Sequence, residues 1–289
     1  SYFESGLENK IKKYLSIYNY VHFYDFDKNP KYEDALKGKV IFTENKCDLI
    51  LAIGGGSAID MAKNINAFQS NPMSDYNEFV KKNLVMNEGV PIIAIPTTSG
   101  TGSEATHFSV IYMDKIKYSL SFQGLLPKDI IIDPNFCISQ TKYQIASSGM
   151  DAFCQAIESY WAVNSNKLSK KYAEKAIRLC DENILNAVKN KDTDAICNMS
   201  IAAYYSGKAI NISKTTAPHA VSYPITTYLG IAHGHAVSLT LAQFMKFNYG
   251  ITDETNNDIR GLKYVVENIE YILKILNLND IEDMILYFD

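Results

Sequence analysis

A nearly continuous apolar run that ends in three glycines is the feature that most constrains this chain. Asp48–Ile53 is followed directly by Gly54–Gly56 and then by a segment with helical spacing at Ala58–Phe68. A short apolar run bounded by glycines is typical of a strand that is buried on both faces, and such strands belong to parallel sheets with crossover helices. The sequence therefore predicts an α/β fold around a parallel sheet.

Strand-like and helix-like runs alternate through the rest of the first half of the chain. Further strands are expected at Val21–Tyr24, Val90–Pro96, Val110–Met113, Tyr118–Phe122 and Asp129–Asp133, and a further helix at Lys31–Asn45. Lys63–Lys82 is polar and mixed in charge, which indicates a helix end and a surface loop. After Gln140 apolar residues recur at helical spacing. We therefore expect an α/β domain over residues 1–140 and a helical domain over residues 141–289.

The composition places the chain among globular proteins and limits its partners. Of 289 residues, 47% are apolar and 21% are charged, which is enough to bury a core. The net charge of −4 provides no cationic field for nucleic acid or an anionic membrane. The five cysteines are scattered and form no Cys-x-x-Cys pair, which favours a reducing cytoplasm over a disulfide framework. We expect a small-molecule partner, with neither nucleic acid nor membrane.

Two loops rich in glycine and hydroxyl groups follow neighbouring strands of the expected sheet. Gly54–Ser57 lies between a strand and a helix, where glycine admits a ligand and the first N–H groups of the helix attract phosphate. Pro96–Glu104 offers hydroxyls and backbone N–H groups in the same position after the next strand. Each loop alone is as typical of an ordinary tight turn. Together they favour a dinucleotide site, because open α/β sheets bind ligands at the carboxyl ends of their strands.

Five motifs, taken in order, resemble the iron-dependent (group III) alcohol dehydrogenase family. They are Gly54-Gly55-Gly56-Ser57-x-x-Asp60, Pro96-Thr97-Thr98-Ser99-Gly100-Thr101-Gly102-Ser103-Glu104, Asp133-Pro134, Gly149-Met150-Asp151-Ala152, and Pro218-His219 through His233-Gly234. The resemblance covers most of the chain. It implies a dinucleotide-binding α/β domain, a helical C-terminal domain with a divalent metal in the cleft between them, and an NAD(P)-dependent alcohol dehydrogenase or aldehyde reductase. We also expect a homodimer.

The two loops supply the residues expected to bind the cofactor, NAD(H) or NADP(H). These residues are Gly54, Gly55, Gly56, Ser57, Asp60, Thr97, Thr98, Thr101 and Ser103. The choice between the two dinucleotides stays open, because the region that often decides it in the family precedes Ser1.

The same resemblance implies a metal site in the helical domain. Asp151 and Gln155 are four residues apart on one face of an expected helix, where the family places an Asp and a His ligand. His219 and His233 match the family's other two ligands and keep its spacing. Gln155 replaces an imidazole by an amide oxygen, so we expect Fe²⁺ or Zn²⁺ to bind weakly or not at all. Without the resemblance, a structural role is favoured for all four residues. His235 is an alternative source of the missing imidazole, although a structural role is favoured for it as well.

Tyr223 lies where many family members carry a histidine that relays the proton of the alcohol. A phenol could perform the same transfer or could simply pack. If no metal binds, His219, His233 and Tyr223 would together stabilise the substrate oxygen as negative charge develops on it.

The segment before His219 predicts an anionic substrate. Lys214, Thr215 and Thr216 offer an ammonium and two hydroxyls that would bind an anionic oxygen cluster, although a polar loop is equally consistent with this composition. The run is similar to the phosphonoacetaldehyde reductase (2-hydroxyethylphosphonate dehydrogenase) branch. The alternatives are another alcohol or polyol dehydrogenase, a lyase like the 3-dehydroquinate synthase group of this fold, and a nucleotide-binding protein without turnover.

The ends of the chain depart from the family pattern. Ser1–Gly6 resembles the stretch that follows the family's first strand, and the chain stops after fewer helices than the family usually has. We therefore expect a first strand to be missing and the helical domain to be incomplete at its C-terminus.

Overall fold

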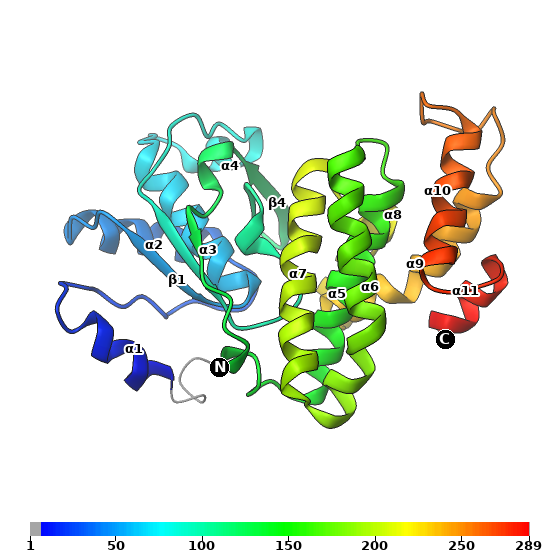
Figure 1. Ribbon diagram of the computed structural model, residues 1–289. Helices are drawn as coiled ribbons and strands as arrows, with labels where there is room; N and C mark the ends of the chain where they lie inside the picture. Colours follow the sequence, from blue (N-terminus) through cyan, green and yellow to red (C-terminus); the bar gives the residue numbers. More distant parts are fainter. Residues whose placement is uncertain (1–6, 289) are drawn as a thin grey trace. The chain divides into compact units, whose positions relative to one another are not determined.

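The computed structural model describes residues 7–288 and divides the chain into two compact units (Figure 1). The first unit contains the residues up to Thr98 together with Ser103–Ser139. The second contains Ser99–Gly102 and the residues from Gln140 onward. Four residues of the loop Pro96–Glu104, the threonine-rich loop, therefore group with the helices. The opening segment Ser1–Gly6 and the strand expected before it lie outside the described residues.

A parallel sheet forms the framework of the first unit. Its described strands are β1 (Ile50–Gly54), β2 (Ile92–Pro96) and β5 (Asp129–Ile130), in the order β1–β2–β5. Gly54 pairs with Pro96, so the glycine turn and the threonine-rich loop leave the sheet side by side. The expected fold class, an α/β part with a parallel sheet and a mostly helical part, is confirmed.

Helices and a hairpin complete the first unit. The helical segments are α1 (Leu7–Leu15), α2 (Tyr32–Glu44), α3 (Gly56–Ser70), α4 (Tyr76–Lys82), and the 3₁₀ turns η1 (Ser103–Ala105), η2 (Gln123–Leu125) and η3 (Pro134–Phe136). The antiparallel hairpin is β3 (Phe108–Met113) with β4 (Ile116–Ser121). On α3, Ile59 and Ala62 are buried against Ile92 of β2, and Phe68 joins an aromatic cluster with Phe79 of α4. Helix α3 therefore packs on the sheet near its start and on α4 near its end.

One secondary-structure expectation in this unit is wrong, and a second is confirmed only in part. Val21–Tyr24 forms no strand, and Val21 and Tyr24 are 42% and 61% exposed, because the described residues give this segment no neighbouring strand to bond. Of the helix end and surface loop expected in Lys63–Lys82, the helix end is confirmed, because α3 runs to Ser70, whereas the exposed loop covers only residues 72–75 before α4. Lys63 is fully buried, and α4 forms where the Asp75 carboxylate accepts a hydrogen bond from the Asn77 N–H and caps the helix start.

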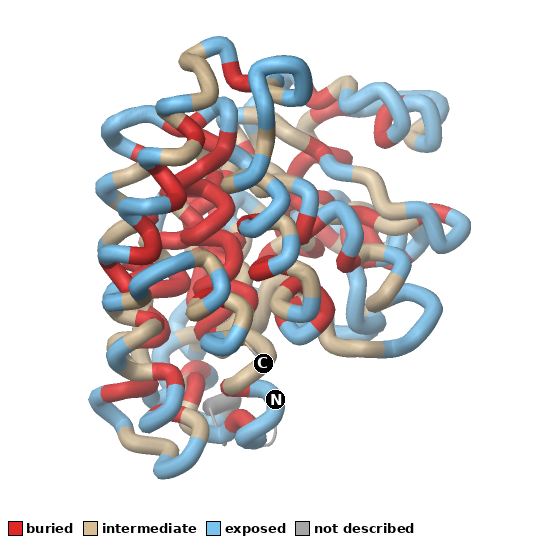
Figure 2. The backbone as a smooth tube through the Cα atoms, turned by 90° about the vertical axis from the view of Figure 1, so that its right-hand side faces the viewer, coloured by how far each residue is buried: buried red, intermediate tan, exposed pale blue. Residues whose placement is uncertain are grey.

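The second unit consists of packed helices. They are α5 (Lys142–Trp161), α6 (Lys167–Asn190), α7 (Thr193–Ser213), α8 (Ala217–Leu229), α9 (His233–Tyr249), α10 (Leu262–Ile275) and α11 (Ile281–Phe288). Every residue of α5 from Ala152 to Trp161 is buried, so its polar side chains need partners inside the protein. Figure 2 shows buried runs along the packed helices and exposed residues on their outer faces. Within residues 7–288, no helix is both long and apolar enough to cross a bilayer.

Helix α8 was not predicted from the sequence, because it contains two prolines. Pro218 lies in the first turn, where the missing N–H would have no partner anyway. Pro224 lies inside the helix and removes one backbone hydrogen bond. Gly230 ends α8 in the left-handed conformation, with φ +70°. The consequence is that His219 lies on a helix, which fixes the direction of its side chain.

Candidate active site

The glycine turn joins β1 to α3 and leaves little space for a side chain at Gly54 or Gly55. Gly54 has φ +154°, and a Cβ at this position would lie 2.5 Å from the Cβ of Ala58. A Cβ on Gly55 would lie 3.1 Å from the side chain of Thr98. Gly55 is also the N-cap of α3 and has no side chain to bond the first N–H groups of the helix. Such N–H groups bind phosphate oxygens at helix starts.

Most of the other predicted cofactor residues lie near this turn in the first unit. Gly56 and Ser57 open α3, and the Thr97 N–H donates to the Gly54 carbonyl at 2.9 Å. Thr101 instead belongs to the second unit. Cofactor binding by these residues stays a prediction.

Asp60 and Ser103 contact each other. The Ser103 hydroxyl donates to Asp60 Oδ1 at 2.5 Å, and the Val110 N–H donates to Oδ2 at 3.0 Å. Burial raises the pKa of Asp60, and the nearby Lys63 ammonium opposes that effect. The two carboxylate oxygens therefore help to hold α3 against the end of the threonine-rich loop and against β3.

Lys63 is a buried cation that the sequence reasoning missed. Its Nζ donates to the carbonyl oxygens of Ser103 at 2.6 Å, Thr106 at 2.8 Å and Phe108 at 2.9 Å. Burial lowers its pKa to about 8, against the opposing effect of two nearby carboxylates. Three carbonyls match the three N–H donors of an ammonium. Lys63 therefore fixes the path of the chain from Ser103 to Phe108 beside α3.

The remaining part of the threonine-rich loop packs on helices of the second unit. The hydroxyls of Ser99 and Ser200 on α7 are 2.8 Å apart. Gly102 lies against the α7 backbone, and a Cβ on Gly102 would lie 2.6 Å from the Ala203 carbonyl oxygen. The small residues of α7 thus let this loop approach closely.

Asp151, His219 and His233 form a metal-sized cluster in the second unit. One ligand atom from each lies within 4.8 Å of the others. His219 Nε2 is 3.4 Å and His233 Nε2 is 3.9 Å from Asp151 Oδ1. The residues come from α5, α8 and the first position of α9. Gly234 lets α9 start close to α5, since a Cβ there would lie 2.8 Å from the Asp151 Cβ.

The second nitrogen of each ring is held by a neighbour. His219 Nδ1 bonds the carboxylate of Glu158, and His233 Nδ1 lies 3.2 Å from the hydroxyl of Ser222. Both Nε2 atoms therefore face Asp151. His219 Nε2 is buried and makes no regular hydrogen bond. Two aimed imidazole nitrogens beside a carboxylate suit a divalent cation, so the residues present fit a metal ion.

Gln155 lies at the cluster, one turn after Asp151. Its Nε2 donates to Asp151 Oδ1 at 2.9 Å, and its Oε1 accepts from the Ser206 hydroxyl at 3.3 Å. Its side chain is buried. The amide thus directs N–H at the carboxylate, and it must turn over before Oε1 can face a cation.

The charged groups of the cluster shift one another's pKa values. Burial lowers the pKa of His219, but Glu158 and Asp151 outweigh burial and raise it to about 9. Burial raises the pKa of Asp151, but His233 and His219 outweigh it and the pKa is lowered. A proton and a divalent cation would therefore compete for the same buried, negatively charged place.

Tyr223 lies beside the cluster, and His235 does not. The Tyr223 ring stacks on the His233 ring with centroids 6.0 Å apart and planes at 22°. His235 is exposed, and its Nδ1 is 3.3 Å from the Tyr143 hydroxyl. The cluster found among the described residues contains His219 and His233, so His235 does not replace the missing imidazole.

The predicted substrate residues begin at the end of α7. Lys214 is exposed, and its backbone has φ +65° and ψ 179°, a conformation that residues other than glycine rarely adopt. The Ser213 hydroxyl bonds the Lys214 carbonyl at 2.9 Å, and Thr215 is half-buried. The Thr216 hydroxyl donates to Glu158 at 2.8 Å and accepts from Trp161 Nε1 at 3.0 Å. Thr216 is thus engaged by the protein.

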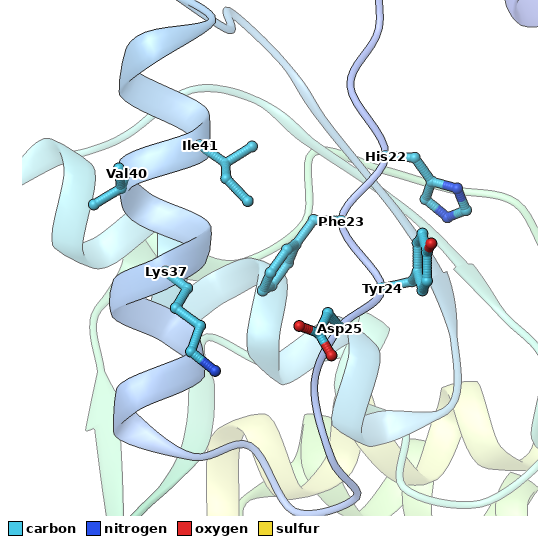
Figure 3. Close-up of a pocket in the computed structure, with 7 residues that line it drawn as sticks. All are labelled: His22, Phe23, Tyr24, Asp25, Lys37, Val40 and Ile41. Carbon is cyan, nitrogen blue, oxygen red and sulfur yellow. The ribbon is translucent and has the colours of Figure 1, made fainter.

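A separate open hollow of about 520 Å³ lies on the first unit (Figure 3). It is lined by His22, Phe23, Tyr24, Asp25, Lys37, Val40 and Ile41. In Figure 3, Phe23 points toward α2, whereas His22 and Tyr24 point away from it. None of the predicted site residues lines this hollow.

Comparison with known proteins assigns the family. The family model "Iron-containing alcohol dehydrogenase" matches residues 1–134, and "Fe-containing alcohol dehydrogenase family, C-terminal" matches residues 145–278. Long-chain-alcohol dehydrogenase 1 of Geobacillus thermodenitrificans is 33% identical over 247 residues, which are 84% of this chain and 62% of that protein. Phosphonoacetaldehyde reductase of Streptomyces viridochromogenes is 32% identical over 231 residues, which are 76% of this chain and 58% of that protein.

Solved structures agree with this assignment. Sulfoacetaldehyde reductase from Bifidobacterium kashiwanohense, in complex with NAD⁺, has a TM-score of 0.81 and 29% identity, covering 96% of this chain and 76% of that one. The chain spans about three fifths of the length of the curated relatives above. Both family models and the fold lead to one conclusion: the chain belongs to the iron-containing alcohol dehydrogenase family.

Proposed function

We propose that this protein reduces a small aldehyde to an alcohol, using NAD(H) or NADP(H) and a divalent metal. The observation that carries the proposal is the cluster of Asp151, His219 and His233, in which the buried Nε2 of His219 makes no regular hydrogen bond. The glycine turn supports it, because a helix start without side-chain caps suits a pyrophosphate.

The reaction requires a hydride, a polarised oxygen and a proton. A C–H bond forms at the carbonyl carbon, the π electron pair moves to the oxygen, and the oxygen takes a proton. Reduced nicotinamide would supply the hydride, and a bound Fe²⁺ or Zn²⁺ would supply Lewis acidity at the oxygen. Asp151, His219 and His233 would hold the metal, and Gln155 would contribute only after its amide turns.

Tyr223 is the proposed proton donor to the alcohol oxygen. Its ring stacks on His233, and it lies one helical turn after His219. If the metal is weakly held, the Tyr223 hydroxyl and the two imidazoles would stabilise the developing charge on the oxygen.

The proposed substrate is phosphonoacetaldehyde, which would give 2-hydroxyethylphosphonate. The support is Lys214, an exposed ammonium whose backbone is held in a costly conformation five residues before His219. Thr215 would add a hydroxyl, whereas the bonds of Thr216 to Glu158 and Trp161 leave it less capacity for a ligand. Two relatives described above carry the names of reductases of anionic aldehydes.

A cofactor oxidation screen tests the proposal. NADH and NADPH consumption is measured with phosphonoacetaldehyde, sulfoacetaldehyde and neutral aldehydes of similar length, with metal analysis of the same sample. Preference for the anionic aldehydes is the expected result. Equal turnover of neutral aldehydes would identify another alcohol or polyol dehydrogenase. Absence of net cofactor oxidation would contradict the redox assignment and favour a lyase or a binding protein. The homodimer and the cytoplasmic location stay predictions.

A further inference from the structure

We infer that Glu158 is a positioning residue that directs His219 toward the metal and fixes the start of the helix that carries it. This inference rests on the proposed metal site. Glu158 lies on α5 with an exposure of 0%. One of its oxygens bonds His219 Nδ1. The other accepts from the N–H and the hydroxyl of Thr216, at 2.6 Å and 2.8 Å.

The contact with His219 decides which ring nitrogen is available to a cation. A carboxylate accepts hydrogen bonds only, so Glu158 requires Nδ1 to carry a proton when it bonds that nitrogen. In the neutral ring Nε2 is then unprotonated and faces Asp151, 3.4 Å from Oδ1. This is the arrangement in which a carboxylate fixes the tautomer and direction of a metal-binding histidine.

The contact with Thr216 secures the helix that carries the ligand. Thr216 is the N-cap of α8, but its side chain makes no capping bond within α8. Its hydroxyl instead joins Glu158 to Trp161, whose Nε1 donates to it at 3.0 Å. One buried carboxylate therefore restrains both the imidazole of His219 and the backbone three residues before it.

Charge gives an independent reason for a carboxylate at this position. Asp151 and Glu158 are both buried beside His219. Two carboxylates balance one divalent cation, whereas a lone buried charge is costly. Loss of Glu158 would leave the cation site with half of its compensating charge.

The test compares Glu158→Gln with a control that alters the same network elsewhere. Glutamine cannot accept at both ends: if its oxygen faces Thr216, its NH₂ faces His219 Nδ1 and shifts the ring proton to Nε2. Zn²⁺ is titrated calorimetrically into metal-free protein. Glu158→Gln should weaken binding about 10- to 100-fold, the usual cost of such a change. Trp161→Phe removes only the donor to Thr216 and should leave Zn²⁺ affinity unchanged.

Each outcome supports or overturns the inference. Equal Zn²⁺ affinity of the parent and Glu158→Gln overturns it. Equal weakening in Glu158→Gln and Trp161→Phe also overturns it, because Glu158 would then act only through the packing of α8. If even the parent binds no Zn²⁺, the metal proposal fails. The tautomer of the His219 ring then tests whether Glu158 positions that ring. Long-range ¹H–¹⁵N spectra of the parent, recorded with the His219 ring in its neutral form, must show the proton on Nδ1. A proton on Nε2 there refutes the inference whether or not the variant folds.

Discussion

Replacing Lys214 by glycine should stabilise the protein while it impairs the proposed activity. Lys214 has φ +65° and ψ 179°, a region that costs a residue other than glycine about 1–3 kcal/mol. Glycine removes this strain but adds about 0.4–1 kcal/mol of unfolded-state entropy. The expected net gain is therefore roughly 0–2.6 kcal/mol. Lys214→Ala is the matched control, because it removes the same ammonium and keeps the backbone strain.

Urea unfolding, followed by the fluorescence of Trp161, measures the free energy of unfolding of the second unit, which contains Lys214. Trp161 is the only tryptophan, lies on α5 and bonds Thr216, two residues after Lys214. The glycine variant should have the higher free energy of unfolding of the two. A glycine variant no more stable than the alanine variant would refute the strain argument.

Kinetics on the same pair of variants test the function of the side chain. A charge-assisted hydrogen bond contributes about 1.5–3 kcal/mol, so both variants should lose roughly 10- to 150-fold in kcat/KM for phosphonoacetaldehyde. Turnover of a neutral aldehyde should barely change. Equal losses on the two aldehydes would show that Lys214 supports the fold or the cofactor rather than an anionic substrate group.

Three further predictions concern the cofactor turn, the metal and pH. Gly55→Val should raise the dissociation constant of NADH or NADPH, because its side chain would meet Thr98, where a Cβ alone lies at 3.1 Å; fluorescence titration checks this, and unchanged affinity in a folded variant contradicts the assignment. Gln155→His should raise the affinity of the purified protein for Zn²⁺ or Fe²⁺, since an imidazole replaces an amide. Full metal occupancy that resists a chelator in the parent, found by elemental analysis, would show that Gln155 does not weaken metal binding. In metal-free protein the folded-state pKa of His219, about 9, exceeds its ordinary value of 6.5, so the folded state binds more protons between these pH values. The free energy of unfolding should therefore fall as pH rises from about 6.5 to 9, and His219→Asn should remove that part of the fall; a parent curve that rises across this window, or an unaltered variant, would contradict the coupling.

The parts of the fold that follow from local pattern were predictable. The apolar run before Gly54 became β1, and the helical spacing around Asp151 became α5. Burial agrees with the local preference of the residues in α5, which is buried from Asp151 to Trp161. In β1, an edge strand of the described sheet, Ala52 is the only buried residue, so the expected burial on both faces is wrong. The prediction of a strand at Val21–Tyr24 was wrong, because a β-branched and aromatic run forms a strand only where a neighbouring strand bonds it.

The missed features depend on partners distant in sequence. Lys63 resembles a surface lysine in its local sequence, and only the carbonyls of Ser103, Thr106 and Phe108 make its burial tolerable. Helix α8 was missed because Pro224 is unfavourable inside a helix by itself. Its formation in the structure shows that tertiary contacts outweigh a propensity cost of about 3 kcal/mol.

Glu158 combines a feature that the sequence shows with one that it does not. Its place on the helix face of the metal ligands is visible in the sequence, whereas its partners are not. Asp151, Gln155 and Glu158 are spaced i, i+4 and i+7, which places all three on one face of a helix. That spacing alone would have put a second carboxylate beside the metal ligands. The identity of its partners was not visible, because His219 and Thr216 reach it from α8, about 60 residues later, through a helix that the local sequence disfavours. A ligand set can therefore be found by its motif, whereas the groups that aim the ligands become evident only once the intervening chain has folded.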